Sequence, residues 1–379
     1  MRILYVNDAL IIWGGLERIL VEKMNYLADT YGYDVHMVTV DQGSHPIPFP
    51  LSPNVHLQDL NVLFQQQYRY KGLKRWLMRW RLQRSFNAEL KKFVDKIRPD
   101  VLICVRMHLL PTMMRVANGI PVIVESHSLC KSYLYDHDRL LQRLKVRYQR
   151  WFVRKAQMVV ALTEGDASEW KNLNKNVCSI PNIVHLNETG RYSDCSAKRV
   201  IFVGRFSRQK DIGSLIKIWV RVHNVHPDWE LCIFAGHGEL YEECMALLSE
   251  AGDLNISVHE PTLDIFEQYQ NSSILLSTSE YEPFGLVLPE AMSCGLPVVA
   301  FDCPYGPADI ISDGVDGFLI KDRNIDVYVE KLCLLMDDQQ LRQTMGEAGI
   351  RSSRRYEADR IMPQWKRLLE DLPKKDCLN

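Results

Sequence analysis

One stretch in the last third of the chain limits the possible folds most. Residues 273–278 form a short apolar run, Ser-Ile-Leu-Leu-Ser-Thr, that is typical of a strand buried in a parallel sheet. The next five residues, Ser-Glu-Tyr-Glu-Pro, indicate a loop, and Pro289 is tolerated only in the first turn of a helix. We therefore predict a strand, a loop and a helix that begins between Gly285 and Pro289 and ends near Gly295.

The predicted loop carries groups that suit a sugar nucleotide. Unbonded N–H groups at a helix start attract anions, and Gly285 allows a ligand to approach the backbone. Glu282 lies in the loop and Glu290 about one to two turns into the helix, so the two carboxylates are separated along the site and would accept hydrogen bonds from sugar hydroxyls. This spacing also occurs on exposed helices, but the flanking Pro-Phe-Gly and Ala-Met-Ser-Cys-Gly-Leu-Pro favour a binding site.

The segment Glu-Pro-Phe-Gly-Leu-Val-Leu-Pro-Glu at 282–290 resembles the signature of the family 4 retaining glycosyltransferases, and residues 301–319 resemble the branch that builds bacterial surface polysaccharides. The resemblance implies an α/β chain with the GT-B fold, in which two Rossmann-like parallel-sheet domains face a central cleft and the C-terminal helix crosses back to the first domain. It assigns Glu290 to the ribose of the nucleotide and Glu282 to the donor sugar. It also places the backbone of four consecutive residues beside the sugar and phosphates: Phe284, Gly285, Leu286 and Val287.

The length of 379 residues exceeds what one hydrophobic core usually supports, so two domains are expected. We predict a Rossmann-like acceptor-side domain at 1–185, a linker at 186–198, a Rossmann-like domain that binds the nucleotide sugar at 199–355, and a crossover helix with a tail at 356–379. Short apolar runs predict strands at 3–6, 35–40, 100–104, 120–126, 157–163 and 177–184 in the first domain, and at 199–204, 230–235, 256–258, 273–278 and 297–301 in the second, where the last run completes the sheet.

Cysteine usage and hydropathy indicate the compartment. The 10 cysteines include no Cys-x-x-Cys pair, and the chain is too large for a disulfide scaffold, so reduced and mostly buried thiols are expected. No apolar run approaches the ~20 residues that span a bilayer, and the apolar start at 3–6 is too short for a secretory signal. We predict a cytoplasmic protein, either free or peripheral on the inner face of the plasma membrane.

Charge is distributed unevenly along the chain. Residues 1–185 contain 26 Lys/Arg against 16 Asp/Glu, a net +10, whereas the remainder carries 20 against 31, a net −11. Much of the excess positive charge lies in a predicted amphipathic helix at 68–98. The C-terminal part of this helix is expected to pack in the hydrophobic core. Such a helix suits an anionic membrane interface, each basic residue contributing roughly 1 kcal/mol, but it also suits a sheet-covering helix with a solvated far side. Its candidate membrane or acceptor residues are Trp76, Trp80, Arg75 and Arg79.

A second basic helix is predicted at 139–155 and would extend the same surface. Nucleic acid is not expected as a partner, because the chain carries no recognised nucleic-acid-binding motif and its other half is acidic. The basic half therefore favours a membrane surface or an anionic acceptor.

Two groups in the first domain are candidate ligand contacts. Gly14 and Gly15 follow the first strand and let a helix start approach a ligand, although their spacing is not that of a dinucleotide-binding fingerprint. The resemblance places this loop near the donor phosphates and the acceptor; the alternative is a turn needed only for packing. His127 follows the strand at 120–126, at the edge where open α/β sheets bind ligands. The resemblance assigns His127 to hydroxyls of the donor sugar, and the alternative is a hydrogen bond that fixes the loop.

The second domain begins with candidate phosphate-binding residues. The strand at 199–204 delivers Arg205 to the carboxyl edge of the sheet, and Lys210 follows in a loop. An arginine can bind a diphosphate through its planar guanidinium, and a lysine through its point charge. The alternative interpretation is that Arg205 and Lys210 each form an ion pair on the surface. Gly236 ends the next strand in a turn that could receive the nucleotide. The sequence after Lys210 departs from the commoner family pattern, and Glu260 stands where a glycine is usual near the base.

These residues predict transfer of a hexose or an N-acetylhexosamine from a uridine diphosphate sugar to a glycan acceptor, expected to be lipid-linked. The resemblance implies that the transfer serves the assembly of capsule, exopolysaccharide or lipopolysaccharide. Arg205 and Lys210 would stabilise the leaving diphosphate, and Glu282 and His127 would hold the sugar in line. By resemblance the leaving phosphate takes the proton of the acceptor, so no cofactor and no metal is expected. The alternatives are an epimerase on the same architecture and a non-catalytic subunit that only binds the sugar nucleotide.

Overall fold

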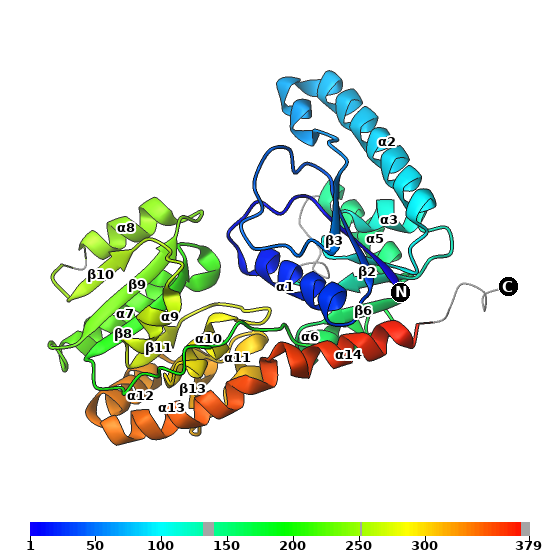
Figure 1. Cartoon of the computed structure of the whole chain (residues 1–379). Coiled ribbons are helices and arrows are strands. Elements are labelled where there is room, and N and C mark those ends of the chain that lie inside the picture. Colours follow the sequence, from blue (N-terminus) through cyan, green and yellow to red (C-terminus); the bar gives the residue numbers. More distant parts are fainter. Residues whose placement is uncertain (132–139, 251, 373–379) are drawn as a thin grey trace. The chain divides into compact units, whose positions relative to one another are not determined.

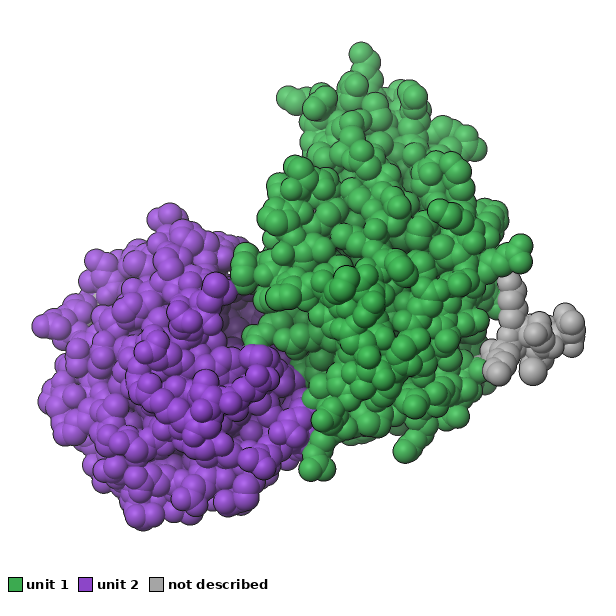
Figure 2. Space-filling view, viewed as in Figure 1, with its two compact units in different colours: residues 1–183, 358–379 green, residues 184–357 purple. Residues whose placement is uncertain are grey.

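The structure is a computed structural model that describes residues 1–131, 140–250 and 252–372 (Figure 1). The chain forms two compact units (Figure 2). Unit 1 contains residues 1–183 and 358–379, and unit 2 contains residues 184–357. Each unit is built on one sheet whose neighbouring strands are parallel. The predicted pair of Rossmann-like parallel sheets is therefore confirmed.

Unit 1 has a seven-stranded sheet with the order β3-β2-β1-β4-β5-β6-β7. Its central strands are buried on both faces because they are nearly continuous apolar runs, and every residue of β4 and β5 is buried. The edge strand β3 differs, since Val55 is its only buried residue. The strands are β1 (Arg2–Asn7), β2 (Asp34–Thr39), β3 (Val55–Asp59), β4 (Val101–Cys104), β5 (Val122–Glu125), β6 (Met158–Ala161) and β7 (Val177–Ser179).

The helix α2 (Gly72–Ile97) confirms the predicted basic helix, after a separate short helix η1 (Phe64–Arg69). Its second half packs on the core through residues spaced three or four apart, from Leu82 to Ile97, and the predicted core segment, Leu90 to Ile97, is part of this stretch. No residue of the first half, 72–81, is buried, so this half lies outside the core of unit 1 (Figure 1). Among the described residues, the amino-terminal part of unit 1 also contains the helices α1 (Gly15–Asp29), α3 (Leu110–Val116), α5 (Leu140–Val153) and α6 (Glu164–Trp170).

The last helix, α14 (Ala358–Glu370), belongs to unit 1 although it follows unit 2 in the sequence. It packs against α1, where the Tyr26 hydroxyl donates to Asp359 over 2.6 Å and the Lys23 ammonium lies 3.9 Å from the centre of the Trp365 ring. The predicted return of the C-terminal helix to the first domain is therefore confirmed.

Unit 2 has a six-stranded sheet with the order β10-β9-β8-β11-β12-β13. The prediction that the run at 297–301 completes this sheet is wrong, because β13 adds a further edge strand. Sequence analysis missed β13 because its apolar run is short and begins at a glycine. The strands are β8 (Arg199–Arg205), β9 (Glu230–Gly236), β10 (Ile256–His259), β11 (Ile274–Ser277), β12 (Val298–Phe301) and β13 (Gly317–Ile320).

The helices of unit 2 cover this sheet and the ends of its strands. Residues 186–198, which precede β8, contain neither helix nor strand, and they pack on unit 2, where the N–H of Ser193 donates to the carbonyl of Cys294 over 2.8 Å. The helices are η2 (Arg208–Lys210), α7 (Ile212–His223), α8 (Tyr241–Glu250), α9 (Ile265–Gln270), α10 (Val287–Ser293), α11 (Gly306–Ile310), η3 (Lys321–Arg323), α12 (Ile325–Asp337), α13 (Gln339–Ser353) and η4 (Arg354–Tyr356).

The direction in which strands are added reverses once in each sheet. The reversal lies between β1 and β4 in unit 1 and between β8 and β11 in unit 2. Open parallel sheets bind ligands at such a switch point, outside the carboxyl ends of the strands. In unit 2 this point brings the loop after β8 beside the loop after β11.

Candidate functional site

Hydrogen bonds join the loops after β8 and β11. Arg205 is the last residue of β8, and Lys210 ends the short helix η2 that follows. The hydroxyl of Thr278 donates to the carbonyl of Lys210 over 2.9 Å, and the N–H of Glu280 donates to the carbonyl of Gln209 over 2.8 Å. The two loops at the switch point are thus held together by hydrogen bonds to the backbone carbonyls of Gln209 and Lys210.

Glu282 is a buried carboxylate with three side-chain partners. Its Oε1 forms an ion pair with Nζ of Lys210 and accepts a hydrogen bond of 2.8 Å from the Ser279 hydroxyl. The Gln209 amide donates to Oε2 over 3.3 Å. These contacts offset the cost of burying the charge and fix the carboxylate in place. Glu282 and Lys210 were expected at different parts of the donor, and their pairing was not predicted from the sequence.

The loop continues from Glu282 into α10 as predicted. Phe284 is buried, and its ring meets that of Tyr356 edge-on at 5.3 Å between centres. Gly285 has a φ of +96°, which explains why a glycine is required there. The N–H groups of Gly285, Leu286 and Val287 donate to no acceptor among the described residues, so they are free for a ligand.

Gly306 packs against the loop that contains Glu282 and Phe284. No role was predicted for Gly306 from the sequence. A Cβ atom on Gly306 would lie 1.7 Å from the carbonyl oxygen of Phe284. The N–H groups of Tyr305 and Gly306 each donate to the carbonyl of Glu282 over 2.9 Å. A glycine between two prolines in Pro-Tyr-Gly-Pro was the available signal, but nothing local shows which loop it touches.

Arg205 and Gly236 lie side by side at the carboxyl edge, because β8 and β9 are paired with these two residues in register. Arg205 is exposed, and its guanidinium has no ion-pair partner among the described residues. A Cβ atom on Gly236 would lie 3.2 Å from the ring of Pro261, so a larger side chain would crowd this edge. The positive charge of Arg205 is therefore available to a ligand.

Glu290 lies in α10 and is buried. The Tyr269 hydroxyl donates to its Oε2 over 3.4 Å. Glu282 and Glu290 thus have different partners, in agreement with the expectation that they do not form an acid–base pair. Unit 2 brings all of its predicted site residues to the loops and helix at the carboxyl edge of its sheet.

In unit 1, Gly14 caps α1 and Gly15 begins it. A Cβ atom on Gly14 would lie 2.8 Å from the carboxylate of the buried Glu17, which accepts a hydrogen bond of 3.0 Å from Arg106. This contact supplies a packing reason for a glycine at position 14. A role of the two glycines in ligand binding stays a prediction.

His127 follows β5 and is largely buried. Its Nε2 lies 3.0 Å from Oε1 of Glu125, whose other oxygen forms a buried ion pair with Lys23. The hydrogen bond that fixes the loop, the alternative considered from sequence, is therefore present. The other ring nitrogen has no hydrogen bond among the described residues, so contact with a sugar stays a prediction.

The first half of α2 exposes Trp76 and Trp80, with 61% and 46% of their surfaces accessible. Arg75 lies over the ring of Tyr68 at 4.6 Å. Among the described residues, no helix is long and apolar enough to cross a membrane. The second basic helix is present as α5, and Arg139, at the start of the predicted segment, lies outside the described residues.

Residues 193–352 match the family described as glycosyl transferases group 1, and residues 13–188 match the one described as glycosyltransferase family 4. An uncharacterized glycosyltransferase of Haemophilus influenzae is 30% identical over 362 residues, which are 94% of this chain and 96% of that protein. The chain belongs to the family 4 glycosyltransferases. The amylovoran biosynthesis glycosyltransferase AmsD of Erwinia amylovora is 26% identical over 379 residues, 97% of this chain and 99% of AmsD.

The fold of this glycosyltransferase is also that of solved structures. A TarM variant from S. aureus, in complex with fondaparinux, α-GlcNAc-glycerol and UDP, superposes with a TM-score of 0.79 over 98% of this chain and all of that chain, at 16% identity. This likeness confirms the GT-B fold that the signature segment implied. The chain is thus an enzyme of a retaining glycosyltransferase family.

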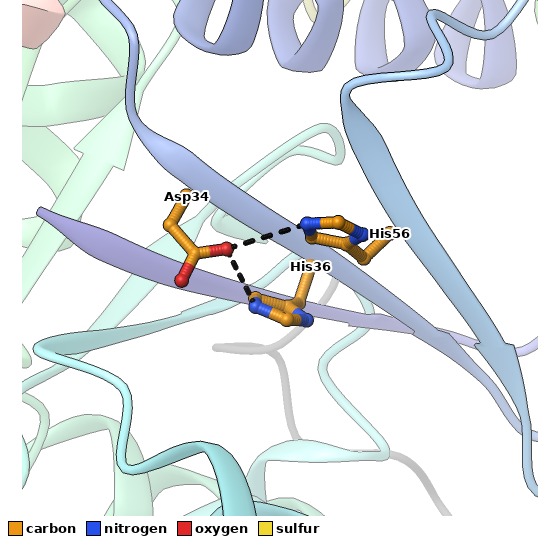
Figure 3. Close-up of side chains that lie close together, drawn as sticks. All are labelled: Asp34, His36 and His56. Carbon is orange, nitrogen blue, oxygen red and sulfur yellow. Dashed lines mark ion pairs between the residues drawn. The ribbon is translucent and has the colours of Figure 1, made fainter.

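Among the described residues of the glycosyltransferase, one group of histidine and carboxylate side chains could hold a metal ion (Figure 3). His36 on β2 is in register with His56 on β3, and Asp34 lies two residues before His36, so the three side chains share one face. Oδ1 of Asp34 lies 2.8 Å from Nε2 of His36 and 3.6 Å from Nε2 of His56. Nε of Arg2 lies 2.5 Å from the other carboxylate oxygen of Asp34, Oδ2, and the positive charge of Arg2 would repel a metal cation bound there. The group lies near the amino ends of its strands, away from their ligand-binding edge.

This group predicts a pH dependence of stability. Burial lowers the pKa of His36, and the charges of His56 and Arg2 lower it further against the opposing effect of Asp34. A histidine whose pKa is lower in the folded state contributes stability above about pH 6.5 and loses it as the pH falls toward the folded pKa. The free energy of unfolding is expected to decrease from about pH 7.5 to about pH 5.5, and to decrease less in His36→Gln. Urea unfolding at both pH values measures this, and equal decreases would contradict it.

Proposed function

We propose that this glycosyltransferase moves a hexose or an N-acetylhexosamine from a UDP-sugar to a lipid-linked glycan acceptor in the assembly of a bacterial surface polysaccharide. One observation carries the proposal. At the switch point of unit 2, the unpaired cation of Arg205, the Lys210–Glu282 pair and the N–H groups that begin α10 belong to adjoining loops. Cations, free N–H groups and a fixed carboxylate are the groups that a sugar diphosphate requires.

The cations act on the leaving diphosphate. Arg205 offers a planar fork to phosphate oxygens, and Lys210 adds a point charge that Glu282 partly offsets. The N–H groups of Gly285, Leu286 and Val287 are further donors. Groups that are already in place when charge develops on the leaving oxygen need no reorganisation, and such stabilisation is usually the largest contribution to the rate.

The remaining site residues hold the donor. Glu282 accepts hydrogen bonds from the sugar, and Glu290 accepts them from the ribose. Gly236 leaves room for the nucleotide. Holding the two reactants in line supplies much of the remaining rate enhancement.

The proton of the acceptor hydroxyl passes to the leaving phosphate on the same face of the sugar. The acceptor oxygen forms its bond to the anomeric carbon as the bond to the diphosphate breaks, and UDP leaves with the proton. The configuration at the anomeric carbon is retained, and the reaction requires neither a metal nor a cofactor.

The acceptor and the membrane are inferred from α2 and from the relatives. The names of the relatives include amylovoran biosynthesis, and the TarM complex contains UDP. The exposed tryptophans and cations of α2 suit an anionic membrane surface, to which each basic residue adds roughly 1 kcal/mol of binding. A lipid-linked acceptor would be held at this surface.

Incubation of the enzyme with a panel of UDP-sugars and lipid-linked acceptors tests the proposal. We expect release of UDP that depends on the acceptor, and a product whose anomeric configuration, measured by NMR, is that of the donor. An isomerised sugar in the absence of acceptor would instead indicate an epimerase. Unchanged cellular glycan synthesis in Glu282→Ala and Arg205→Ala strains would indicate a non-catalytic subunit.

A further inference from the structure

Unit 1 contains a cavity of about 670 Å³ beneath α2, a volume typical of ligand-binding sites. Its walls come from η1, α2, α3 and α5 and from the residues that follow β1, β2 and β4. The cavity therefore opens at the carboxyl edge of the sheet, at the switch point where such sheets bind ligands.

Four cations on three helices line this cavity: Arg75 and Arg79 on α2, Arg115 on α3 and Lys145 on α5. None of the four has a carboxylate partner among the described residues. Arg75 lies over the Tyr68 ring, and Arg115 donates to the Tyr148 hydroxyl. Cations from separate helices that share one cavity without ion-pair partners are an arrangement that an anion would stabilise.

The two acidic groups of the cavity are already bonded. Asp41 accepts hydrogen bonds from the N–H groups of Leu63 and Phe64, the latter over 2.8 Å. Oδ1 of Asp8 lies 2.8 Å from Nε2 of His108. These carboxylates fix loops of unit 1 and keep their charge, so the four cations exceed the two carboxylates by two (4 − 2 = +2) and the cavity is net positive.

The same helix carries the apolar surface described above. Leu73, Trp76, Leu77 and Trp80 follow helical spacing on one face of α2, whereas Arg75 and Arg79 lie on a different face. All four apolar side chains are exposed. Because one face is apolar and another face meets a cationic cavity, α2 fits a ligand that joins a lipid chain to an anionic group.

We propose that this cavity binds the phosphate or diphosphate of the lipid carrier on which the acceptor glycan is built, while the apolar face of α2 lies in the membrane interface. The proposal rests on the proposed function and adds to it the group that the enzyme recognises on its acceptor. Arg115 and Lys145 hold the anionic group from one side and Arg75 and Arg79 from the other, whereas the glycan remains free to receive the sugar.

Vesicle sedimentation tests the proposal with the full-length protein. The probes are phosphatidylcholine vesicles that carry a polyprenyl diphosphate, and vesicles that carry phosphatidylglycerol at the same total charge. We expect the wild-type protein to bind the diphosphate vesicles more than about tenfold more tightly, because several charge-assisted hydrogen bonds form only there. The double variant Arg115→Gln/Lys145→Gln is expected to lose this preference.

The matched control is Lys74→Gln/Arg81→Gln, which removes two exposed cations of α2 that do not line the cavity. It is expected to weaken binding to both kinds of vesicle by a similar factor and to keep the preference. A wild-type protein without the preference, or a preference that survives Arg115→Gln/Lys145→Gln, would overturn the proposal. Circular dichroism confirms that each variant is folded, and UDP binding by the same proteins shows separately whether the donor site of the proposed function exists.

Discussion

Replacing Arg205 by alanine is expected to lower kcat/KM for glycosyl transfer about 100- to 1,000-fold, the usual effect of removing one preorganised group that stabilises developing charge. Arg205 ends β8 and has no ion-pair partner among the described residues, so its charge is available to the leaving diphosphate. Lys210 is a less direct test, because its removal would leave the buried Glu282 without its counter-ion and would disturb the loop as well.

Two further variants separate the role of Arg205 from a general effect of charge. Arg205→Lys keeps the charge but loses the planar fork, so a decrease of about tenfold is expected. Arg208 lies in the adjacent helix η2, where its side chain is 83% exposed and 3.8 Å from Glu280. An exposed ion pair of this kind contributes little, so Arg208→Ala is expected to change kcat/KM by less than about twofold. Similar rates of UDP release for Arg205→Ala and Arg208→Ala would contradict the assignment of Arg205 to the donor site.

The free energy of unfolding is expected to fall by about 3–5 kcal/mol in Lys23→Ala, the cost of leaving one member of a buried ion pair alone. Lys23 is 1% exposed and pairs with Glu125 beneath the Trp365 ring. Burial by itself would raise the pKa of Glu125, but Lys23 and His127 lower it to about 2 from an ordinary 4.5. The stability contributed by this carboxylate is therefore present above pH 4.5 and is lost as the pH falls toward 2.

Urea unfolding of a small set of variants measures this effect. Lys91→Ala is the control, because Lys91 forms an exposed pair with Asp95 at 2.7 Å on α2 and is expected to contribute less than about 0.5 kcal/mol. The double variant Lys23→Met/Glu125→Leu removes both buried charges. Its loss of stability is expected to be smaller than the sum of the losses in the single variants Lys23→Met and Glu125→Leu. Equal losses in Lys23→Ala and Lys91→Ala would contradict a stabilising role for the buried pair.

Local sequence features predicted the donor loop well because they act over a few residues. The apolar run of β11, the glycine at 285 and the proline at 289 fix a strand, a turn with positive φ and a helix start without help from the rest of the chain. The strand β8 likewise fixes the place of Arg205. Two of the four edge strands, β3 and β13, were not predicted; β3 buries only Val55 and therefore lacks the apolar run of a central strand.

The contacts that could not be predicted join residues far apart in the sequence. Lys210 and Glu282 are 72 residues apart, and Lys23 and Glu125 are 102 apart. Each becomes a pair only because parallel strands bring their loops or helices together, and no local pattern identifies the partner. The contact of Gly306 with the Phe284 carbonyl and the cationic cavity beneath α2 arise in the same way.

Calorimetric titration of UDP into the wild-type enzyme, Glu290→Ala and Glu347→Ala tests the donor site most directly. Glu347 is an exposed glutamate of α13, outside the site, whereas Glu290 is buried in α10 behind the signature loop. We expect one UDP to bind per chain, with affinity at least about tenfold weaker in Glu290→Ala, because hydrogen bonds to the ribose are lost, and unchanged in Glu347→Ala. Absence of UDP binding to the wild-type enzyme, or equal affinities in all three proteins, would contradict a sugar-nucleotide site at the carboxyl edge of unit 2.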